Sequence, residues 1–166
     1  MDQTTTGIDI LLGLFDLSQG QLREAYADIP DDRMADAFPG IVNHPAWTLT
    51  HLIAAAGGIA AVLGDPAPGS SPDELARFGP GSKPVADRSA YEPKVALLER
   101  LASRHAHAAR VVRERHAERF PLPPPPPFTN FAPTAGNIAS YLLACHEPYH
   151  LGQLMVWRRA AGLGKA

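Results

Sequence analysis

The stretch AWTLTHLIAAAGGIAAVL, residues 46–63, lies within the longest segment of the chain without a charged residue or a proline, and it has the composition of a buried helix. Pro45 suits the first turn of a helix, where its missing N–H costs nothing, and Asn43 or His44 would cap that turn. Gly64, followed by a proline, predicts where the helix ends. We therefore expect an apolar helix over about 46–63.

Apolar residues recur at helical spacing in three further segments, interrupted in the first of them by the polar Ser18. These segments span about residues 8–26, 92–117 and 134–161. The intervening stretch 65–90 is rich in Pro, Gly and Ser, which predicts little regular structure beyond a turn around 72–78. Such a connection can cross a bundle and place neighbouring helices parallel. We predict one all-α domain over residues 1–166, a four-helix bundle with a long crossover connection.

Composition excludes several classes of partner. The 166 residues carry a net charge of −2, which provides no basic footprint for nucleic acid or for an anionic membrane surface. The single cysteine, Cys145, can form neither an internal disulfide nor a cysteine-based zinc site. A chain without an internal disulfide is typical of a reducing compartment. The first residues lack the pattern of a secretory signal, and the longest apolar stretch, 52–64, is too short to span a bilayer. We expect a soluble cytoplasmic protein with no nucleic-acid or membrane partner.

The last helical segment contains His146-Glu147-Pro148-Tyr149-His150, in which two histidines stand four residues apart. On a helix this spacing projects both imidazoles from one face, about one turn apart. The same face carries apolar neighbours, so we expect the pair to point into the bundle. Two buried imidazoles can chelate a divalent cation, or they can be core histidines bonded to main-chain carbonyls.

The position of His51 favours a metal site over a pair of core histidines. It lies inside the segment 46–63 with Trp47 one turn before it and Ala55 one turn after it, so it too should face inward. A third imidazole from a facing helix would complete a three-nitrogen site with one vacant position, which is typical of a catalytic zinc ion. Water or substrate would occupy the remaining position.

Two motifs, NHPAWTLTHL at 43–52 and HEPYHLGQL at 146–154, resemble the helix-two and last-helix motifs of the DinB-like (YfiT-like) proteins. The resemblance covers nearly the whole chain and implies a four-helix bundle with a long crossover, often dimeric. It implies a divalent metal ion, Zn²⁺ or Ni²⁺, held by His51, His146 and His150. It also implies thiol-dependent transferases and isomerases that use mycothiol, bacillithiol or glutathione, alongside members with no assigned activity.

One residue departs from the family pattern, because Pro148 stands between the two histidines where a small helix former is usual. It removes the hydrogen bond to the carbonyl of Ala144 and tends to kink the helix. Either the kink aims His150 at the metal, which we favour, or it weakens the site.

Other polar residues near these motifs have competing interpretations. His105 falls on the apolar stripe of the segment 92–117 and could be a fourth ligand or a proton shuttle, although a core histidine is the favoured interpretation. Glu147 satisfies the His-Glu-x-x-His pattern of metalloproteases, but it should point about 100° away from the metal face. No His or Glu follows His150 to serve as a third protease ligand, so we disfavour a protease. Gln153 could hydrogen-bond a histidine or a substrate, and a purely structural role is equally compatible with the sequence.

The sequence thus predicts a metal-dependent transferase or isomerase in which the cation binds a small-molecule thiol and lowers its pKa. The chain supplies no evident nucleophile of its own. Two alternatives stay open: a hydrolase that uses metal-activated water, and a non-enzymatic bundle for binding or dimerisation.

Overall fold

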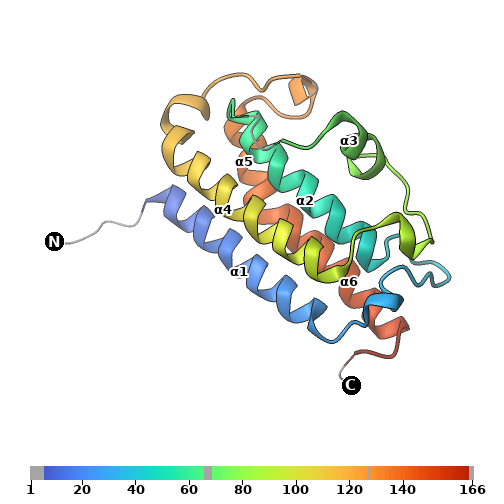
Figure 1. Ribbon diagram of the computed structural model, residues 1–166. Helices are drawn as coiled ribbons and strands as arrows, with labels where there is room; N and C mark the ends of the chain where they lie inside the picture. Colours follow the sequence, from blue (N-terminus) through green and yellow to red (C-terminus); the bar gives the residue numbers. More distant parts are fainter. Residues whose placement is uncertain (1–5, 66–68, 127, 165–166) are drawn as a thin grey trace.

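The computed structural model describes residues 6–65, 69–126 and 128–164, and the predicted all-α class is confirmed. The expectation of no secretory signal falls largely on residues 1–5, which lie outside the described residues. The four long helical segments lie side by side with their axes roughly aligned (Figure 1). They are α1 (Gly7–Ala27), α2 (Pro45–Val62), α4 (Lys94–Arg119), and a last segment made of α5 (Ala135–Tyr141), the π-helical turn η4 (Leu142–His146) and α6 (Glu147–Ala160). Short elements join them: α3 (Pro72–Phe78) and the 3₁₀ turns η1 (Asp31–Arg33), η2 (Arg88–Ala90) and η3 (Phe128–Asn130).

Side chains at the helix starts satisfy the first free N–H groups. At α1 the Thr6 hydroxyl accepts from the Asp9 N–H, while the Asp9 carboxylate accepts from the Thr6 N–H, a reciprocal capping box. At α2 the cap is His44, whose Nδ1 accepts from the N–H of Trp47 at 3.3 Å, with Pro45 in the first turn. His44 is therefore a helix cap.

Helix α2 lies at the centre of the molecule. By length and composition it could cross a membrane, but 83% of its apolar window is buried inside the protein, as in the core helix of a soluble protein. Its side chains enter both parts of the core. One part surrounds Trp47, Leu52 and Trp157, and the other surrounds Ile59, Val112 and Leu143.

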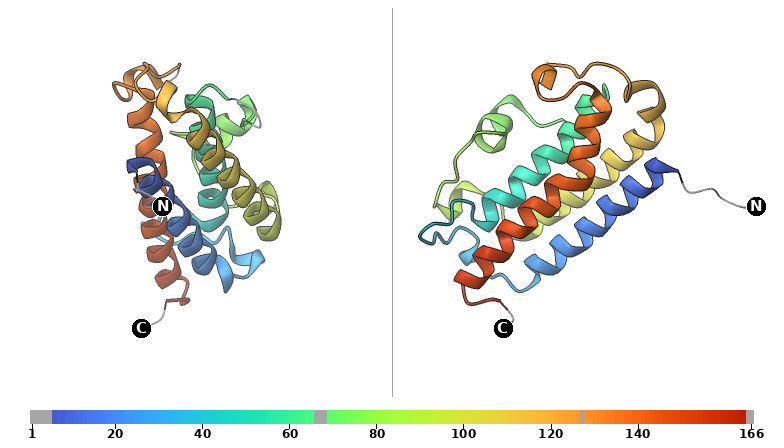
Figure 2. Two further views of the ribbon diagram at one scale, coloured as in Figure 1. Left: turned by 90° about the vertical axis from the view of Figure 1, so that its left-hand side faces the viewer. Right: turned by 180° about the vertical axis from the view of Figure 1, so that it is seen from behind.

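The connection from α2 to α4, which includes α3 and η2, is the predicted crossover. It runs along the outside of the bundle and returns the chain to the end at which α2 began, so α2 and α4 run parallel (Figures 1 and 2). Contacts agree with this direction, since Gly57 lies near Arg104 and Gly64 near Arg119. Helix α4 begins two residues later than the periodicity predicts, because Pro93 occupies its N-cap position.

The last segment is not the single continuous helix predicted over 134–161. A π-helical turn interrupts it at Leu142–His146, directly before Pro148 in α6. Pro148 has no N–H for the i−4 carbonyl, and π turns, in which the bonds reach five residues back, occur where the regular ladder is disturbed. The predicted disturbance at Pro148 thus takes the form of a π turn that ends on His146.

Candidate metal centre

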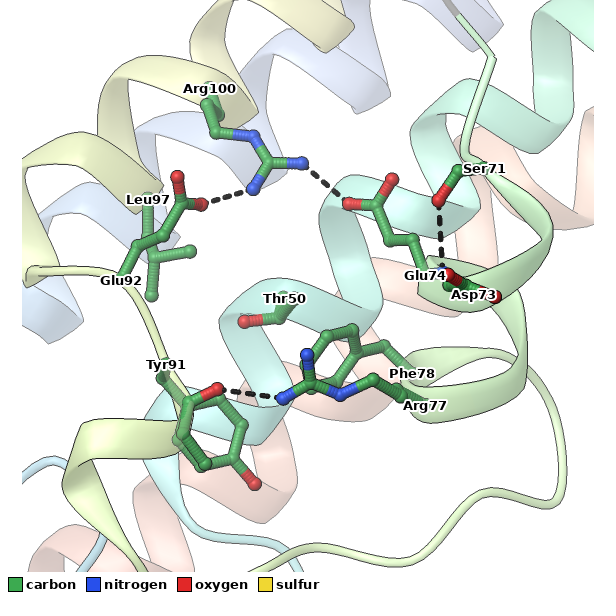
Figure 3. A pocket seen from close by; sticks show the side chains of 11 residues that line it. Thr50, Ser71, Asp73, Glu74, Arg77, Phe78, Tyr91, Glu92, Leu97 and Arg100 are labelled. Carbon is green, nitrogen blue, oxygen red and sulfur yellow. Dashed lines mark hydrogen bonds and ion pairs between the residues drawn. The ribbon is translucent and has the colours of Figure 1, made fainter.

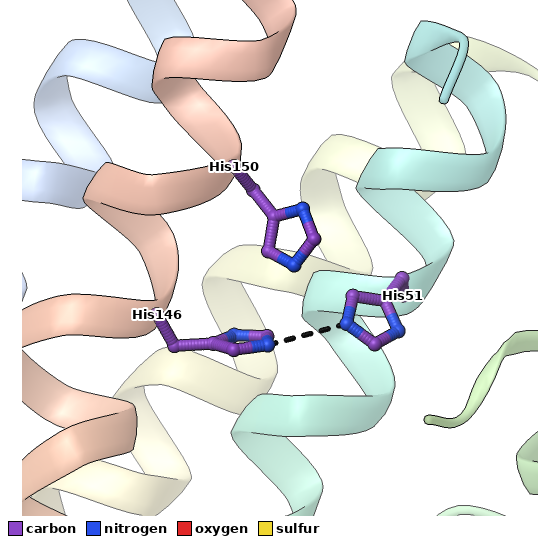
Figure 4. A group of neighbouring side chains, drawn as sticks. All are labelled: His51, His146 and His150. Atoms are coloured by element: carbon purple, nitrogen blue, oxygen red, sulfur yellow. Dashed lines mark hydrogen bonds between the residues drawn. The ribbon is translucent and has the colours of Figure 1, made fainter. Parts of the chain in front are cut away.

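His51, His146 and His150 lie together where α2 faces the junction of η4 and α6 (Figure 4). One ring nitrogen from each lies within 4.8 Å of the others. His51 and His150 are buried, and His146 is partly buried. The structure therefore brings together the three residues that the sequence singled out, and the cluster could hold a metal ion.

The distance between two of the rings fits a metal ion. Nε2 of His51 and Nε2 of His146 lie 3.2 Å apart. Two nitrogen ligands about 2.0–2.1 Å from a tetrahedral zinc ion would lie about 3.4 Å from each other. Without a cation one of these nitrogens must carry a proton and donate to the other. The Nδ1 atom of His146 is buried with no hydrogen-bond partner among the described residues, so no acceptor holds a proton on Nδ1, and Nε2 is the nitrogen that meets His51.

A main-chain carbonyl orients His51. Its Nδ1 donates to the carbonyl oxygen of Phe78, at the end of α3, at 2.6 Å. The indole of Trp47, one turn earlier in α2, stacks on the ring with 4.8 Å between centroids and an interplanar angle of 7°. Because a carbonyl only accepts, the proton of neutral His51 sits on Nδ1, and Nε2 keeps its lone pair for a ligand.

A side-chain amide orients His150 in the same way. Nδ1 of His150 lies 3.0 Å from Oε1 of Gln153, and this oxygen also accepts from Nδ2 of Asn43 at 2.8 Å. The two donors fix the orientation of the Gln153 amide, which in turn assigns the proton of His150 to Nδ1. Gln153 thus orients His150, which is one of the roles predicted for it.

All three imidazoles are neutral at pH 7. Burial, with smaller contributions from the neighbouring rings, lowers the pKa of His146 to about 3 and that of His150 to about 4. Burial also lowers the pKa of His51, against the opposing effect of its bond to Phe78. Neutral imidazole is the form that binds metal ions, so protons compete little with a cation here.

Glu147 and His105 lie on the other side of the last helix. The Glu147 carboxylate accepts from the Ser18 hydroxyl at 2.6 Å and pairs with Nε2 of His105 at 2.5 Å. All three residues are at most 3% exposed, and the ring of Phe15 stacks on His105 with 3.5 Å between centroids. Glu147 therefore points away from the metal face, as predicted, and His105 is a core histidine. The proposed fourth-ligand role of His105 is wrong, because its Nε2 is bonded to Glu147.

A small cavity of about 80 Å³ adjoins the histidine cluster and is lined by His51 and His146 but not by His150. A second hollow, of about 340 Å³, lies between α3 and the start of α4 (Figure 3). In the second hollow the guanidinium of Arg100 bonds both Glu74 and Glu92, so it is already paired with two carboxylates of the lining. The small cavity is the space that belongs to the candidate metal centre.

Some of these partners could have been predicted from sequence patterns, and others could not. Ser18 is a polar residue on an apolar helix face, which indicates a buried hydrogen bond. Its partner Glu147, 129 residues away, could not be predicted from this pattern. The Phe78 carbonyl has no side-chain signature at all. The stacking of Trp47 on His51 follows from their i, i+4 spacing and could have been predicted.

Among the comparisons with known proteins, a family model matches the chain. No curated protein and no solved structure matches the chain significantly. A family model does match, over residues 14–154, a range that includes the three clustered histidines, α2, α4 and the last helical segment as far as Leu154. On this match the chain belongs to the DinB superfamily.

Proposed function

We propose that His51, His146 and His150 bind one divalent metal ion, Zn²⁺ or Ni²⁺, and that the protein is a thiol-dependent transferase or isomerase. The observation that carries the metal is the convergence of three neutral imidazoles within 4.8 Å, two of them held with one ring nitrogen directed at a hydrogen-bond acceptor. Three protein ligands leave a tetrahedral ion one position for a small molecule. The thiol chemistry and the choice of metal come from the family resemblance of the two motifs.

A metal ion in this position would supply one kind of chemistry, which is to lower the pKa of a bound thiol or water. The protein contributes the orientation of its ligands and a partly closed apolar surrounding. Of the nearby side chains, Glu147 is turned into the core and Cys145 is exposed on the surface, so neither is placed as a base or nucleophile. A reacting group that arrives with the substrate fits this arrangement better than one supplied by the chain, and a small-molecule thiol is such a group.

Metal analysis tests the first half of the proposal. We expect purified protein to hold about one equivalent of metal and His150→Ala to hold almost none. His116→Ala is the matched control, because His116 bonds only carbonyls of its own helix, near the C-terminal end of α4. Equal metal in all three proteins, or metal in none, would favour the alternative of a non-enzymatic bundle.

An activity screen tests the second half. The metal-loaded protein is incubated with a panel of electrophiles, with and without mycothiol, bacillithiol or glutathione, and in parallel with esters and amides. We expect turnover that requires both metal and thiol. Turnover of an ester or amide without thiol would replace the proposal with the hydrolase alternative.

We also propose that the protein is a cytoplasmic homodimer. Support for a dimer comes from α1, where Ile10, Leu14 and Leu17 are 57%, 44% and 59% exposed and stand at helical spacing on one face. Light scattering should report twice the chain mass of 17.8 kDa, and Leu14→Glu should reduce it to the monomer. A monomeric wild-type protein would overturn this part.

A further inference from the structure

The cavity beside the histidines is built from small and apolar residues. Its lining includes Ala55 and Gly58 of α2, Leu75 of α3, Phe128 of η3 and Leu142 of η4. Apart from His51 and His146, the described residues that line it are all Ala, Gly, Leu, Pro or Phe. Because no charged side chain is among these residues, a charged group of an organic ligand that entered would lose its hydration without gaining a counter-charge. The cavity therefore selects for an uncharged group.

Its size sets a limit on that group. The cavity measures about 80 Å³. An apolar cavity of about 150 Å³ binds benzene, so this one holds roughly half of such a ring, or about three carbon atoms. Leu75 is 46% exposed and stands at the edge, so a longer chain would leave the cavity and meet water. Affinity should therefore rise with chain length only over the first few carbons.

We propose that this cavity is a subsite for a short, uncharged alkyl group of about three carbons, carried by the molecule that binds at the metal's vacant position. The inference rests on the proposed three-histidine metal centre and specifies its ligand. The charged part of a large thiol cosubstrate would have to lie elsewhere. Gly58 limits the subsite, because a Cβ built on it meets nothing within 4 Å and a larger side chain there would occupy the free space.

The test uses the cobalt-loaded protein, because Co²⁺ bound by nitrogen ligands gives visible absorption and a bound thiolate adds a charge-transfer band. The probes are methanethiol, ethanethiol, 1-propanethiol, 1-butanethiol and 1-hexanethiol, each of which would bind as thiolate and release its proton to the buffer. We expect affinity to rise about fourfold per added methylene, which corresponds to about 0.8 kcal/mol, and to stop rising beyond three or four carbons. 2-Mercaptoethanol has as many heavy atoms as 1-propanethiol but ends in a hydroxyl, and should bind about tenfold more weakly.

Two variants locate the effect. Gly58→Leu should remove the gain from chain length while leaving methanethiol affinity nearly unchanged, and leucine is a better helix former than glycine, so the helix should persist. Gly20→Leu is the matched control, since Gly20 is an exposed glycine of α1 with equally open surroundings. Leu75→Ala should move the limit to longer chains.

The outcomes separate the two proposals. Absence of cobalt bands overturns the metal centre and the subsite with it. Cobalt bands without any thiolate band overturn both the thiol chemistry and the subsite. Thiolate bands with no dependence on chain length, or with Gly58→Leu behaving like Gly20→Leu, overturn the subsite alone.

Discussion

Replacement of Glu147 tests whether the buried hydrogen bonds behind the histidines hold the last helix in place. Glu147 is 2% exposed and accepts from Ser18 of α1 while pairing with His105 of α4. One carboxylate therefore joins three helices inside the core. We expect Glu147→Ala to destabilise the protein strongly, because His105 would lose its buried partner, while the Ser18 hydroxyl would keep only its bond to the Phe15 carbonyl.

The size of the effect follows from the number and kind of contacts. Removal of one partner from a buried acid–base pair costs about 3–5 kcal/mol, out of a total folding free energy of about 5–15 kcal/mol for a typical domain. For a chain of this size each kcal/mol lowers the Tm by about 2–4 °C, which gives a fall of about 6–20 °C. Glu147→Gln should lose less, about 1–2 kcal/mol, because the amide keeps one acceptor and the Ser18 hydroxyl can turn to accept from its NH₂ group.

Urea unfolding followed by circular dichroism at pH 7 measures these losses. Glu114→Gln is the control, since Glu114 pairs with Arg110 on the surface of α4, where both side chains are about half exposed. Surface pairs of this kind contribute about 0.5 kcal/mol or less. If Glu147→Gln and Glu114→Gln lost the same small amount, or if Glu147→Ala lost less than about 1 kcal/mol, the reasoning would be refuted.

Three further results are expected. Metal retention should stay constant from pH 8 to about pH 5 and fall near pH 4. His146 and His150, with pKa values of about 3 and 4, become protonated only in that range. Dialysis against buffers of decreasing pH, followed by metal analysis, measures the retention. Gln153→Leu removes the acceptor that orients His150 and should weaken metal affinity about 10–100-fold in a chelator competition, with unfolding in urea little changed. The hydrogen-bonded guanidinium of Arg158 lowers the pKa of Asp28 below 3.8, so their contact stabilises the fold above that pH and is lost as the pH falls through the lowered pKa. Asp28→Asn should therefore make the Tm depend less on pH on the acid side. A Tm–pH curve identical to that of the wild type would contradict the assignment.

The arrangement of the long helices could be predicted because its signals are local. Apolar periodicity indicated the four segments, and Pro and Gly marked most of their ends. The crossover followed from the length and composition of one connection, and it makes α2 and α4 parallel. The helix α4 begins two residues later than predicted, with Pro93, which has no N–H, at its N-cap.

The candidate site could be predicted only in part, for a physical reason. The i, i+4 spacing of His146 and His150 and the inward face of His51 are properties of single helices. Gln153, which orients His150, also lies on the same helix, three residues later. The remaining groups are distant in sequence, since the carbonyl of Phe78 lies 27 residues from His51 and the amide of Asn43 lies 110 residues from Gln153. Such partners depend on how helices and loops pack, and no sequence spacing encodes them.

The π turn connects these observations. His146 and Glu147 are neighbours in sequence, yet the first faces α2 and the second faces α1 and α4. A helix presents consecutive side chains about 100° apart. When other helices pack on both sides, adjacent residues can therefore contact different helices. The turn ends on His146, and α6 starts on Glu147, whose carboxylate is bonded to two other helices. We infer that the bonds of Glu147 fix the rotation of the last helix at the point where Pro148 has weakened its own ladder, and so keep His146 directed at His51.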